Sequence, residues 1–233
     1  MILRPAEQPY DGAALLAFLA RRAVPGVEEV LADGTYRRSL PDGRIVELRA
    51  VDGGIETNIA VPGLLDLDAP VGEIAARLGA IYSPGTRVPG CVDPHEIAVR
   101  AVLGQQITVG AARTHAGRLV AAVGEPLREP VGAVTHIFPT LEAIAGAPDS
   151  AFAMPRARRD TLRSLAGQPL DRLHELRGVG PWTQTYVNMR ALGDRDAWLP
   201  TDVGVRHGLE RLGRVDPERW RPFRAYAVVS LWR

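Results

Sequence analysis

The hydrophobic pattern of this chain changes its period along the sequence, and this change constrains the fold more than any other feature. Between Thr35 and Val61, apolar residues alternate with polar ones, which is the period of half-buried strands. From Asp93 onward the apolar residues recur with helical spacing, and no strand is predicted there. The segregation of the two patterns predicts an α+β fold.

Two turn sequences divide the alternating region. Pro41-Asp42-Gly43 separates residues 35–40 from residues 44–51, which predicts a β-hairpin. Asp52-Gly53-Gly54 forms the second turn, and Ile55, Thr57, Ile59 and Val61 alternate along a further strand. We therefore expect a small antiparallel sheet in the N-terminal part of the chain.

Helices are predicted before and after these strands in the sequence. Residues 11–23 form an amphipathic helix that Asp11 can cap, and residues 70–80 return to helical character. The Pro- and Gly-rich segment Tyr82–Pro94 is typical of a linker. The predicted helices beyond it cover residues 93–103, 108–123, 140–146, 148–153, 156–165, 171–176, 181–192, 202–212 and 219–232.

Two domains follow from this pattern. Residues 1–88 are predicted to form a small antiparallel sheet with helices. Residues 89–233 are predicted to form a larger, all-helical body with a cleft between its helical parts. No apolar run approaches the roughly 20 residues that span a bilayer, so we expect a soluble, cytoplasmic protein.

The basic residues are unevenly distributed and are all arginine. Residues 1–155 carry 13 Arg against 18 Asp and Glu, whereas residues 156–233 carry 15 Arg against 9, so a net charge of +1 conceals a basic last third. This pattern fits a phosphate-binding surface and equally an Arg-rich solvated surface. Because lysine is absent, no side-chain amine can form a Schiff base. The single cysteine, Cys91, excludes a four-cysteine metal cluster within this chain.

The run Leu173–Thr183 predicts two helices joined by a tight hairpin. Gly178 suits a helix terminus, Gly180 keeps the loop free of side chains, and Pro181 suits the first position of the next helix. Backbone amides exposed at a helix N-terminus bind anions, and a DNA phosphate is the natural candidate. An ordinary helix–turn–helix corner would show the same residues.

Asp202 follows this hairpin in the run Leu199–Arg206. Pro200 prevents a helix from continuing through this run, so a new helix should begin after Asp202. The simplest role of Asp202 is to cap that helix. Its functional role would be that of a carboxylate that stabilises a developing positive sugar and orients a water. Aromatic residues near it, such as Trp182 and Tyr186 on one helix face, are either core residues or a platform that stacks on a base.

These residues together resemble a known family. The motifs LRGVGPWT and LPTDVGVR resemble the helix–hairpin–helix DNA glycosylases, in which a catalytic aspartate follows the hairpin. PYDGAALLAFLARRAV, VPGCVDPHEIAVRAVLGQQIT and ERWRPFRAYAVVSLW are similar to DNA-3-methyladenine glycosylase II of bacteria. The resemblance runs from about residue 8 to the C-terminus, with the blocks in the same order.

The resemblance implies a role for particular residues. It makes Asp202 the catalytic aspartate and assigns Trp182, Tyr186, Trp232 and Phe18 to the base pocket. It implies DNA contacts for the hairpin and for a neighbouring loop, namely Gly178, Val179, Gly180, Thr183, Gln105 and Gln106. It also implies that the carbonyl groups of His174, Leu176 and Val179 hold a structural Na⁺ or K⁺, with no other cofactor required.

Two positions depart from the family pattern. Gln106 stands where the resemblance implies an apolar wedge that fills the space left by a flipped base. Val203 stands where it implies an aromatic residue, so we expect a wider pocket on that side.

The resemblance implies base excision repair in a bacterial cytoplasm, by a monomer acting on duplex DNA. The enzyme would flip out an alkylated base of the 3-methyladenine type and hydrolyse its N-glycosidic bond. Aromatic faces would favour a cationic base through cation–π attraction. Because lysine is absent, we expect a monofunctional glycosylase without strand-cleaving lyase activity. Two alternatives remain: a non-catalytic protein that binds DNA damage on the same scaffold, and a glycosylase for uracil or oxidised bases.

Overall fold

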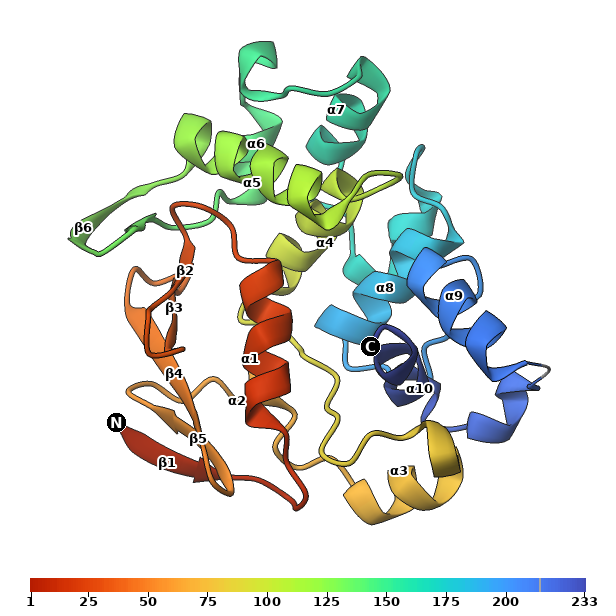
Figure 1. Cartoon of the computed structure of the whole chain (residues 1–233). Coiled ribbons are helices and arrows are strands. Elements are labelled where there is room, and N and C mark those ends of the chain that lie inside the picture. The colour runs from red at the N-terminus through yellow and green to blue at the C-terminus, as the bar shows by residue number, and fades with distance from the viewer. Residues whose placement is uncertain (214) are drawn as a thin grey trace.

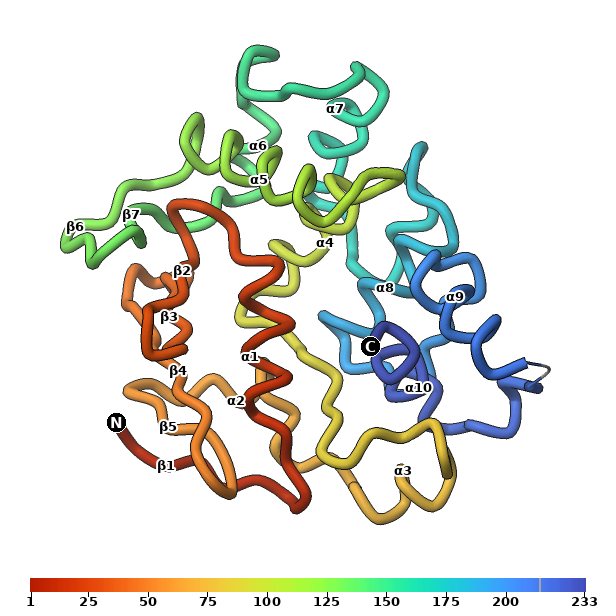
Figure 2. Tube along the Cα trace, viewed as in Figure 1, coloured from red at the N-terminus to blue at the C-terminus, as the bar shows by residue number. Residues whose placement is uncertain are grey.

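The computed structural model describes residues 1–213 and 215–233, and it has an α+β fold. Figure 1 shows the antiparallel sheet on one side of the molecule, with most of the helices gathered on the other. Helix α1 (Gly12–Arg21) lies between the two parts. The Cα trace in Figure 2 shows how the C-terminal helix α10 (Arg224–Leu231) comes to lie near α1 and α8, although these segments are distant in sequence.

The N-terminal sheet has five strands in the order β1-β5-β4-β3-β2, and all neighbours are antiparallel. The strands are β1 (Ile2–Pro5), β2 (Glu28–Val30), β3 (Tyr36–Ser39), β4 (Ile45–Val51) and β5 (Gly54–Thr57). The predicted hairpin is confirmed as β3 and β4, with Tyr36 opposite Leu48. The strand predicted over 55–61 is shorter, because Pro62 begins a helix and residues 58–61 turn toward it.

Two strands of this sheet were not predicted. Both β1 and β2 lie on the outer edges, where one side of the strand forms no ladder. Neither shows a full alternation of buried and exposed residues, since β1 is largely exposed and β2 has only three residues. The local pattern therefore carries no signal for them, and their pairing depends on the neighbouring strand.

The α-helices after the sheet are α2 (Pro62–Leu65), α3 (Val71–Leu78), α4 (Pro94–Leu103), α5 (Val109–Val123), α6 (Leu141–Ala145), α7 (Arg156–Arg163), α8 (Pro181–Ala191) and α9 (Val203–Leu212), followed by α10. Most lie close to their predicted positions, but α2 was not predicted, and the helices predicted over 148–153 and 171–176 are 3₁₀ turns. Short 3₁₀ turns connect them: η1 (Gly79–Ile81), η2 (Asp149–Ala151), η3 (Leu170–Glu175) and η4 (Pro217–Trp220). Within the described ranges, no helix combines the length and apolar character that crossing a membrane requires.

The expectation of an all-helical body with no strands is wrong in one place. Strands β6 (Pro126–Val131) and β7 (Val134–His136) form a two-stranded antiparallel sheet between α5 and α6. Two prolines in β6 argue against a strand when only the sequence is read, but proline is tolerated where a strand has a free edge. The β6–β7 hairpin also contacts the large sheet, since Ser39 Oγ donates to the carbonyl of His136 at 2.7 Å.

Three hydrophobic clusters form the core. One packs α1 against the sheet, a second joins α4, α5, α6 and α7, and a third joins α3 to α9 and α10. Residues such as Ile74 and Leu78 thus share a core with Trp220 and Tyr226, far along the chain. The domain division at residue 88 stays a prediction, and α3 packs with the C-terminal helices rather than with the sheet.

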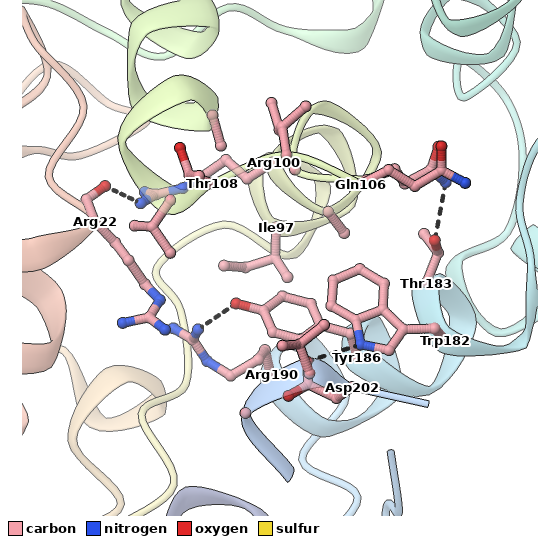
Figure 3. Close-up of a pocket in the computed structure, with 18 of the residues that line it drawn as sticks. Arg22, Ile97, Arg100, Gln106, Thr108, Trp182, Thr183, Tyr186, Arg190 and Asp202 are labelled. Carbon is pink, nitrogen blue, oxygen red and sulfur yellow. Dashed lines mark hydrogen bonds between the residues drawn. The ribbon is translucent and has the colours of Figure 1, made fainter. Parts of the chain in front are cut away.

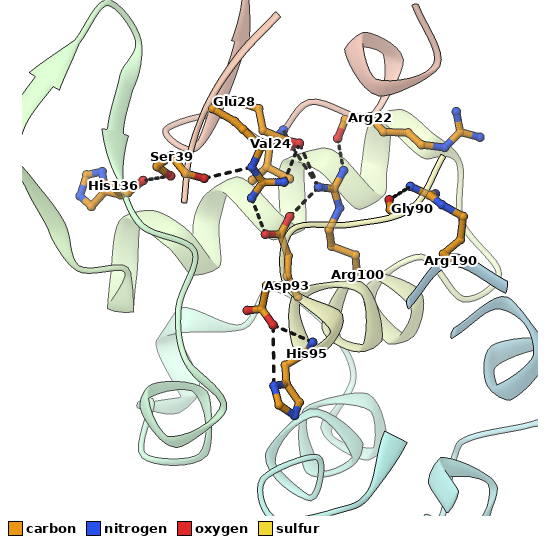
Figure 4. A network of polar contacts seen from close by, with 12 residues as sticks. Arg22, Val24, Glu28, Ser39, Gly90, Asp93, His95, Arg100, His136 and Arg190 are labelled. Atoms are coloured by element: carbon orange, nitrogen blue, oxygen red, sulfur yellow. Dashed lines mark hydrogen bonds and ion pairs between the residues drawn. The ribbon is translucent and has the colours of Figure 1, made fainter. Parts of the chain in front are cut away.

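A buried ionic network joins the sheet to the helical body, as Figure 4 shows. Arg100 on α4 contacts Glu28 Oε2 at 3.0 Å and Glu96 Oε1 at 2.8 Å, and Arg38 on β3 pairs with Glu96 as well. Tyr36 donates its hydroxyl to Glu28. Burial alone would raise the pKa of Glu96, but the charges of Arg38 and Arg100 hold it below its usual value. This network fixes the end of α1, because Arg100 also donates to the backbone carbonyl of Arg22.

Candidate active site

The predicted hairpin is present between η3 and α8. Gly178 has a φ of +91°, and a Cβ there would collide with Oγ1 of Thr161, which itself donates to the carbonyl of Arg177 at 2.9 Å. Only glycine therefore fits this position without strain. Gly180 is exposed and has open space around its Cα, while Pro181 is the first residue of α8.

The side chain of Val179 anchors the hairpin instead of facing solvent. It is 8% exposed and packs in the core with residues of α4 and α8. Its backbone N–H donates to the carbonyl of Leu176 at 3.1 Å. Any DNA contact by Val179 must therefore come from its backbone.

Gln105 and Thr183, both expected near DNA, contact each other and hold the hairpin in place. Nε2 of Gln105 donates to the carbonyl of Gly178 and to Oγ1 of Thr183, each at 2.9 Å. Arg158 donates to the carbonyl of Gln105 at 2.9 Å. Thr183 is only 2% exposed. These two side chains thus join the α4–α5 loop to the hairpin.

Gln106 is placed differently from Gln105. It is exposed at the tip of the α4–α5 loop and has a φ of +58°, which is unusual for a residue other than glycine. Such a backbone costs about 1–3 kcal/mol, and residues of this kind cluster at functional sites. The geometry fits a side chain that projects from the protein surface beside the pocket (Figure 3).

Asp202 caps α9, and its carboxylate is held by three donors. Oδ1 accepts from the backbone N–H of Val205 at 3.0 Å and from the indole N–H of Trp232 at 2.8 Å. Oδ2 accepts from the indole N–H of Trp182 at 3.0 Å. Asp202 therefore caps α9 and also lines the cavity described below, and its catalytic role stays a prediction.

Two glycines of α9 allow Trp232 to approach Asp202. A Cβ at Gly204 would lie 2.6 Å from Cδ1 of Trp232, and one at Gly208 would lie 2.7 Å from Cβ of Leu231. These glycines are four residues apart, so they lie on the same face of α9 and admit α10 there. Sequence reasoning missed them, although their spacing on one helix was a usable signal.

The aromatic residues form a continuous wall. Trp182 stacks on Tyr186 with ring centroids 5.1 Å apart, Tyr186 lies 6.5 Å from Trp232, and Trp232 stacks on Phe18 at 6.0 Å. Trp182, Tyr186, Trp232 and Asp202 line a cavity of about 1100 Å³, and Gln105, Gln106, Gly178, Gly180 and Thr183 line it too. Val203 lies at its rim and is 62% exposed.

Phe18 occupies a second row behind this wall. It is 5% exposed, it is not among the residues that line the cavity, and the guanidinium of Arg22 lies 3.6 Å from its ring centroid. Its role is to support Trp232 and Arg22, and its ring face is not free to stack on a base.

Two arginines that line the pocket were not predicted from the sequence. Arg22 and Arg190 lie in the pocket beside the aromatic residues (Figure 3). Each follows a predicted pocket aromatic by four residues, Phe18 and Tyr186 respectively, so helical spacing could have found both. Burial alone would raise the pKa of Tyr186, but Arg190, Arg22 and Arg100 outweigh it and lower that pKa.

The three residues expected to hold a cation lie along the segment that leads into the hairpin. His174 is the fifth residue of η3, Leu176 follows η3, and Val179 precedes α8 by two residues. Their carbonyl oxygens are neutral hard donors, the type that replaces the hydration shell of K⁺. The carbonyl of Leu176 already accepts one hydrogen bond, and it has a second lone pair to offer. The cation itself stays a prediction.

The chain is similar in sequence to known DNA repair proteins. A family model described as "AlkA N-terminal domain" matches residues 3–61. The chain is 38% identical to a Mycobacterium tuberculosis protein named "Probable bifunctional transcriptional activator/DNA repair enzyme AlkA", over 98% of this chain and 55% of that protein. It thus spans about half the length of that relative.

Two further comparisons cover nearly the full length of both proteins. The chain is 32% identical to "DNA-3-methyladenine glycosylase 2" of Escherichia coli, over 97% of this chain and 94% of that protein. Its fold matches the solved structure of "3-methyladenine dna-glycosylase from Archaeoglobus fulgidus" with a TM-score of 0.80 at 20% identity, covering 100% and 97% of the two chains.

Proposed function

Because the chain belongs to the DNA-3-methyladenine glycosylase family of AlkA, we propose that its pocket receives an alkylated base flipped out of duplex DNA. Asp202 then supports hydrolysis of the N-glycosidic bond of that base. The observation that carries this proposal is the orientation of Asp202, whose carboxylate is held by two indole N–H groups at the edge of an aromatic cavity.

The chemistry follows from this arrangement. A base alkylated on a ring nitrogen carries a positive charge, so it leaves with the electron pair of the C1′–N bond and becomes neutral. The fixed carboxylate of Asp202 stabilises the oxocarbenium character that develops on the sugar. A water then adds to C1′, and its proton passes to Asp202 and on to solvent. The products are a free base and an abasic site.

We assign no lyase step to this chain. Strand cleavage through a Schiff base requires a primary amine, and the sequence contains no lysine. The only primary amine of this sequence is the N-terminal amino group, and Met1 lies at the start of β1 on the sheet, on the far side of α1 from α8 (Figure 1). We therefore propose a monofunctional glycosylase, and the monomeric state stays a prediction.

The hairpin and its surroundings would bind the DNA backbone. The exposed amides at Gly178 and Gly180 lie at the N-terminus of α8, where a phosphate is favoured. Arg177 and Arg206 are exposed, and neither forms an ion pair within the part of the chain that the structure describes. A plot of log affinity against log salt concentration should have a slope of about −0.9 for each phosphate contact. Replacing either arginine should make this slope less negative by about 0.9.

A monovalent cation at the carbonyls of His174, Leu176 and Val179 would stiffen the hairpin. Its contribution is tested by measuring DNA affinity in KCl and in tetramethylammonium chloride at equal ionic strength. We expect weaker binding in tetramethylammonium, which is too large to enter the turn. Equal affinity in both salts would remove the cation from this model of binding.

The decisive experiment measures base release from methylated DNA by the wild-type chain and by Asp202→Asn. Asparagine caps a helix as well as aspartate does, so the fold should persist while the rate falls by about 10²- to 10⁴-fold. Asp216→Asn is the matched control, because Asp216 caps η4 through the N–H of Glu218 and lies outside the pocket. Wild type without any base release would refute the enzymatic function. Full activity in Asp202→Asn would refute the assignment of the carboxylate only.

A further inference from the structure

The pocket contains more positive charge than an aromatic cage for a cation would need. Four arginines line it, against the single carboxylate of Asp202. The four are Arg22, Arg100, Arg113 and Arg190. Glu28 and Glu96 neutralise Arg100, but among residues 1–213 and 215–233 no carboxylate lies within ion-pair distance of the other three.

Two of these three guanidinium groups are bound to the protein. Arg190 donates to the carbonyls of Pro89 and Gly90 and to the hydroxyl of Tyr186, the last at 2.8 Å. Arg113 donates Nε–H to the carbonyl of Ala23 at 2.8 Å. Both side chains therefore have structural roles.

Arg22 is held more weakly than either, although the guanidinium of Arg113 also makes a single hydrogen bond among the described residues. The guanidinium of Arg22 makes one side-chain hydrogen bond among the described residues, a long one of 3.4 Å to the carbonyl of Phe18 in its own helical turn. A guanidinium has five N–H donors, so most of the donors of Arg22 are available in the cavity. Burial, with the nearby charge of Arg190, lowers the pKa of Arg22 to about 10 although Tyr186 opposes this shift.

The backbone of Arg22 is held firmly while its side-chain donors remain available. Arg100 donates to the carbonyl of Arg22 from the buried network of Figure 4. The guanidinium then lies against the ring of Phe18 and within 5.8 Å of the ring centroid of Trp232. Figure 3 shows Arg22 and Arg190 at one end of the pocket, with Gln106 and Thr183 at the other.

We propose that Arg22 is a specificity-determining residue that donates hydrogen bonds to acceptor atoms on the edge of the flipped base. It thereby favours neutral bases that carry a carbonyl oxygen over cationic ones. This inference rests on the proposed function and adds a selectivity to it.

Two physical effects support this preference. A partly desolvated guanidinium repels a cationic base and forms a charge-assisted hydrogen bond with a carbonyl oxygen. In addition, Arg22 lies 5.8 Å from the ring centroid of Trp232 and Arg190 lies 5.7 Å from that of Tyr186, so these pocket rings offer less cation–π attraction to the base. A phosphate of the DNA backbone offers the same acceptor chemistry, but Arg22 lies away from the hairpin end of the pocket, where the backbone would bind.

The test compares two substrates in single-turnover reactions. One is DNA with a single hypoxanthine, a neutral base with a carbonyl oxygen, and the other is methylated DNA from which N3-methyladenine, a cationic base, is released. In Arg22→Met, we expect hypoxanthine release to fall about 10- to 100-fold. Release of N3-methyladenine should stay the same or rise several-fold, because the charge that repels a cationic base is gone.

Two further variants separate selectivity from folding. Arg21→Met is the matched control, because Arg21 is the exposed last residue of α1, and it should behave as wild type on both substrates. Arg22→Lys retains the charge with a less directional donor and should restore hypoxanthine release only in part.

The outcomes distinguish the inference from the function on which it rests. Equal loss on both substrates in Arg22→Met would indicate a phosphate contact or a structural role and would overturn the inference. Unchanged rates on both, or a wild type that releases N3-methyladenine but no hypoxanthine, would also overturn it. A wild type that releases neither base would refute the proposed function itself.

Discussion

Trp232 donates its indole N–H to Oδ1 of Asp202 at 2.8 Å from a position 30 residues further along the chain. The contact joins the last turn of the molecule to the N-terminus of α9. Trp232 and Trp182 bind different oxygens of this carboxylate, Oδ1 and Oδ2 respectively. The pair therefore couples the position of the C-terminal helix to the proposed chemistry.

Replacing Trp232 with phenylalanine tests this coupling. Phenylalanine keeps an aromatic face against Phe18 but cannot donate to Asp202. A hydrogen bond to a charged group contributes about 1.5–3 kcal/mol, so base release should fall by about 10- to 100-fold. Trp198→Phe is the control, since Trp198 packs on Trp220 outside the cavity and should retain its rate. Equal rates for the two variants would exclude an orienting role for Trp232.

A methyl group at Gly204 should displace Trp232 without changing any polar group. The new Cβ would meet Cδ1 of Trp232, so we expect Gly204→Ala to reduce the rate of base release and to lower stability by about 1–3 kcal/mol. Gly72→Ala in α3 has open space and should be neutral or slightly stabilising. Thermal unfolding and single-turnover release measure both effects. Undiminished release by Gly204→Ala would show that α10 can shift without consequence.

The two hairpin glycines should respond differently to alanine. Gly178→Ala forces a side chain into the left-handed region and against Thr161, so we expect it to cost more than about 1 kcal/mol of stability. Gly180→Ala has room and an ordinary φ, so its stability should be unchanged while its DNA affinity falls if a phosphate binds there. Denaturant unfolding and DNA titration provide the comparison. Full DNA affinity in Gly180→Ala would place the backbone contact elsewhere.

Acid should weaken the link between the sheet and the helices. The folded-state pKa of Glu96 lies below its unfolded value of about 4.3, so this group stabilises the fold above that pH and the contribution is lost as the pH falls through the folded value. Glu96→Gln should lose about 3–5 kcal/mol at pH 7 and show a smaller further loss between pH 5 and pH 3 than wild type. The exposed Glu142→Gln should match wild type at every pH. Parallel pH curves for Glu96→Gln and wild type would argue against the assigned pKa direction.

The sequence predicted those parts of the fold and site that depend on neighbouring residues. The β3–β4 hairpin has its turn residues between its strands, and Asp202 carries its own capping signal before α9. Strands β1 and β2 lacked such signals because their hydrogen bonds come from other strands. Strand β6 was not predicted because its sequence contains two prolines, and its pairing depends on the neighbouring strand β7.

The site followed the same rule. Trp182 and Tyr186 were predictable because one helix presents both, whereas the stacking of Phe18 on Trp232 depends on how α1 meets the C-terminal helix. The resemblance to the family named Phe18 but not its position behind the residues that line the pocket, and it named Thr183 but not its hydrogen bond to Gln105. Both are set by packing between segments distant in sequence, which no local pattern records.

The hydrogen bond from Arg100 to the carbonyl of Arg22 ties one wall of the pocket to residues that belong to the sheet. The carboxylate of Asp202 and the guanidinium of Arg22 come from opposite ends of the chain, yet both contact Trp232. A change in how α1 meets the C-terminal helix should therefore alter the rate of reaction and the choice of base together.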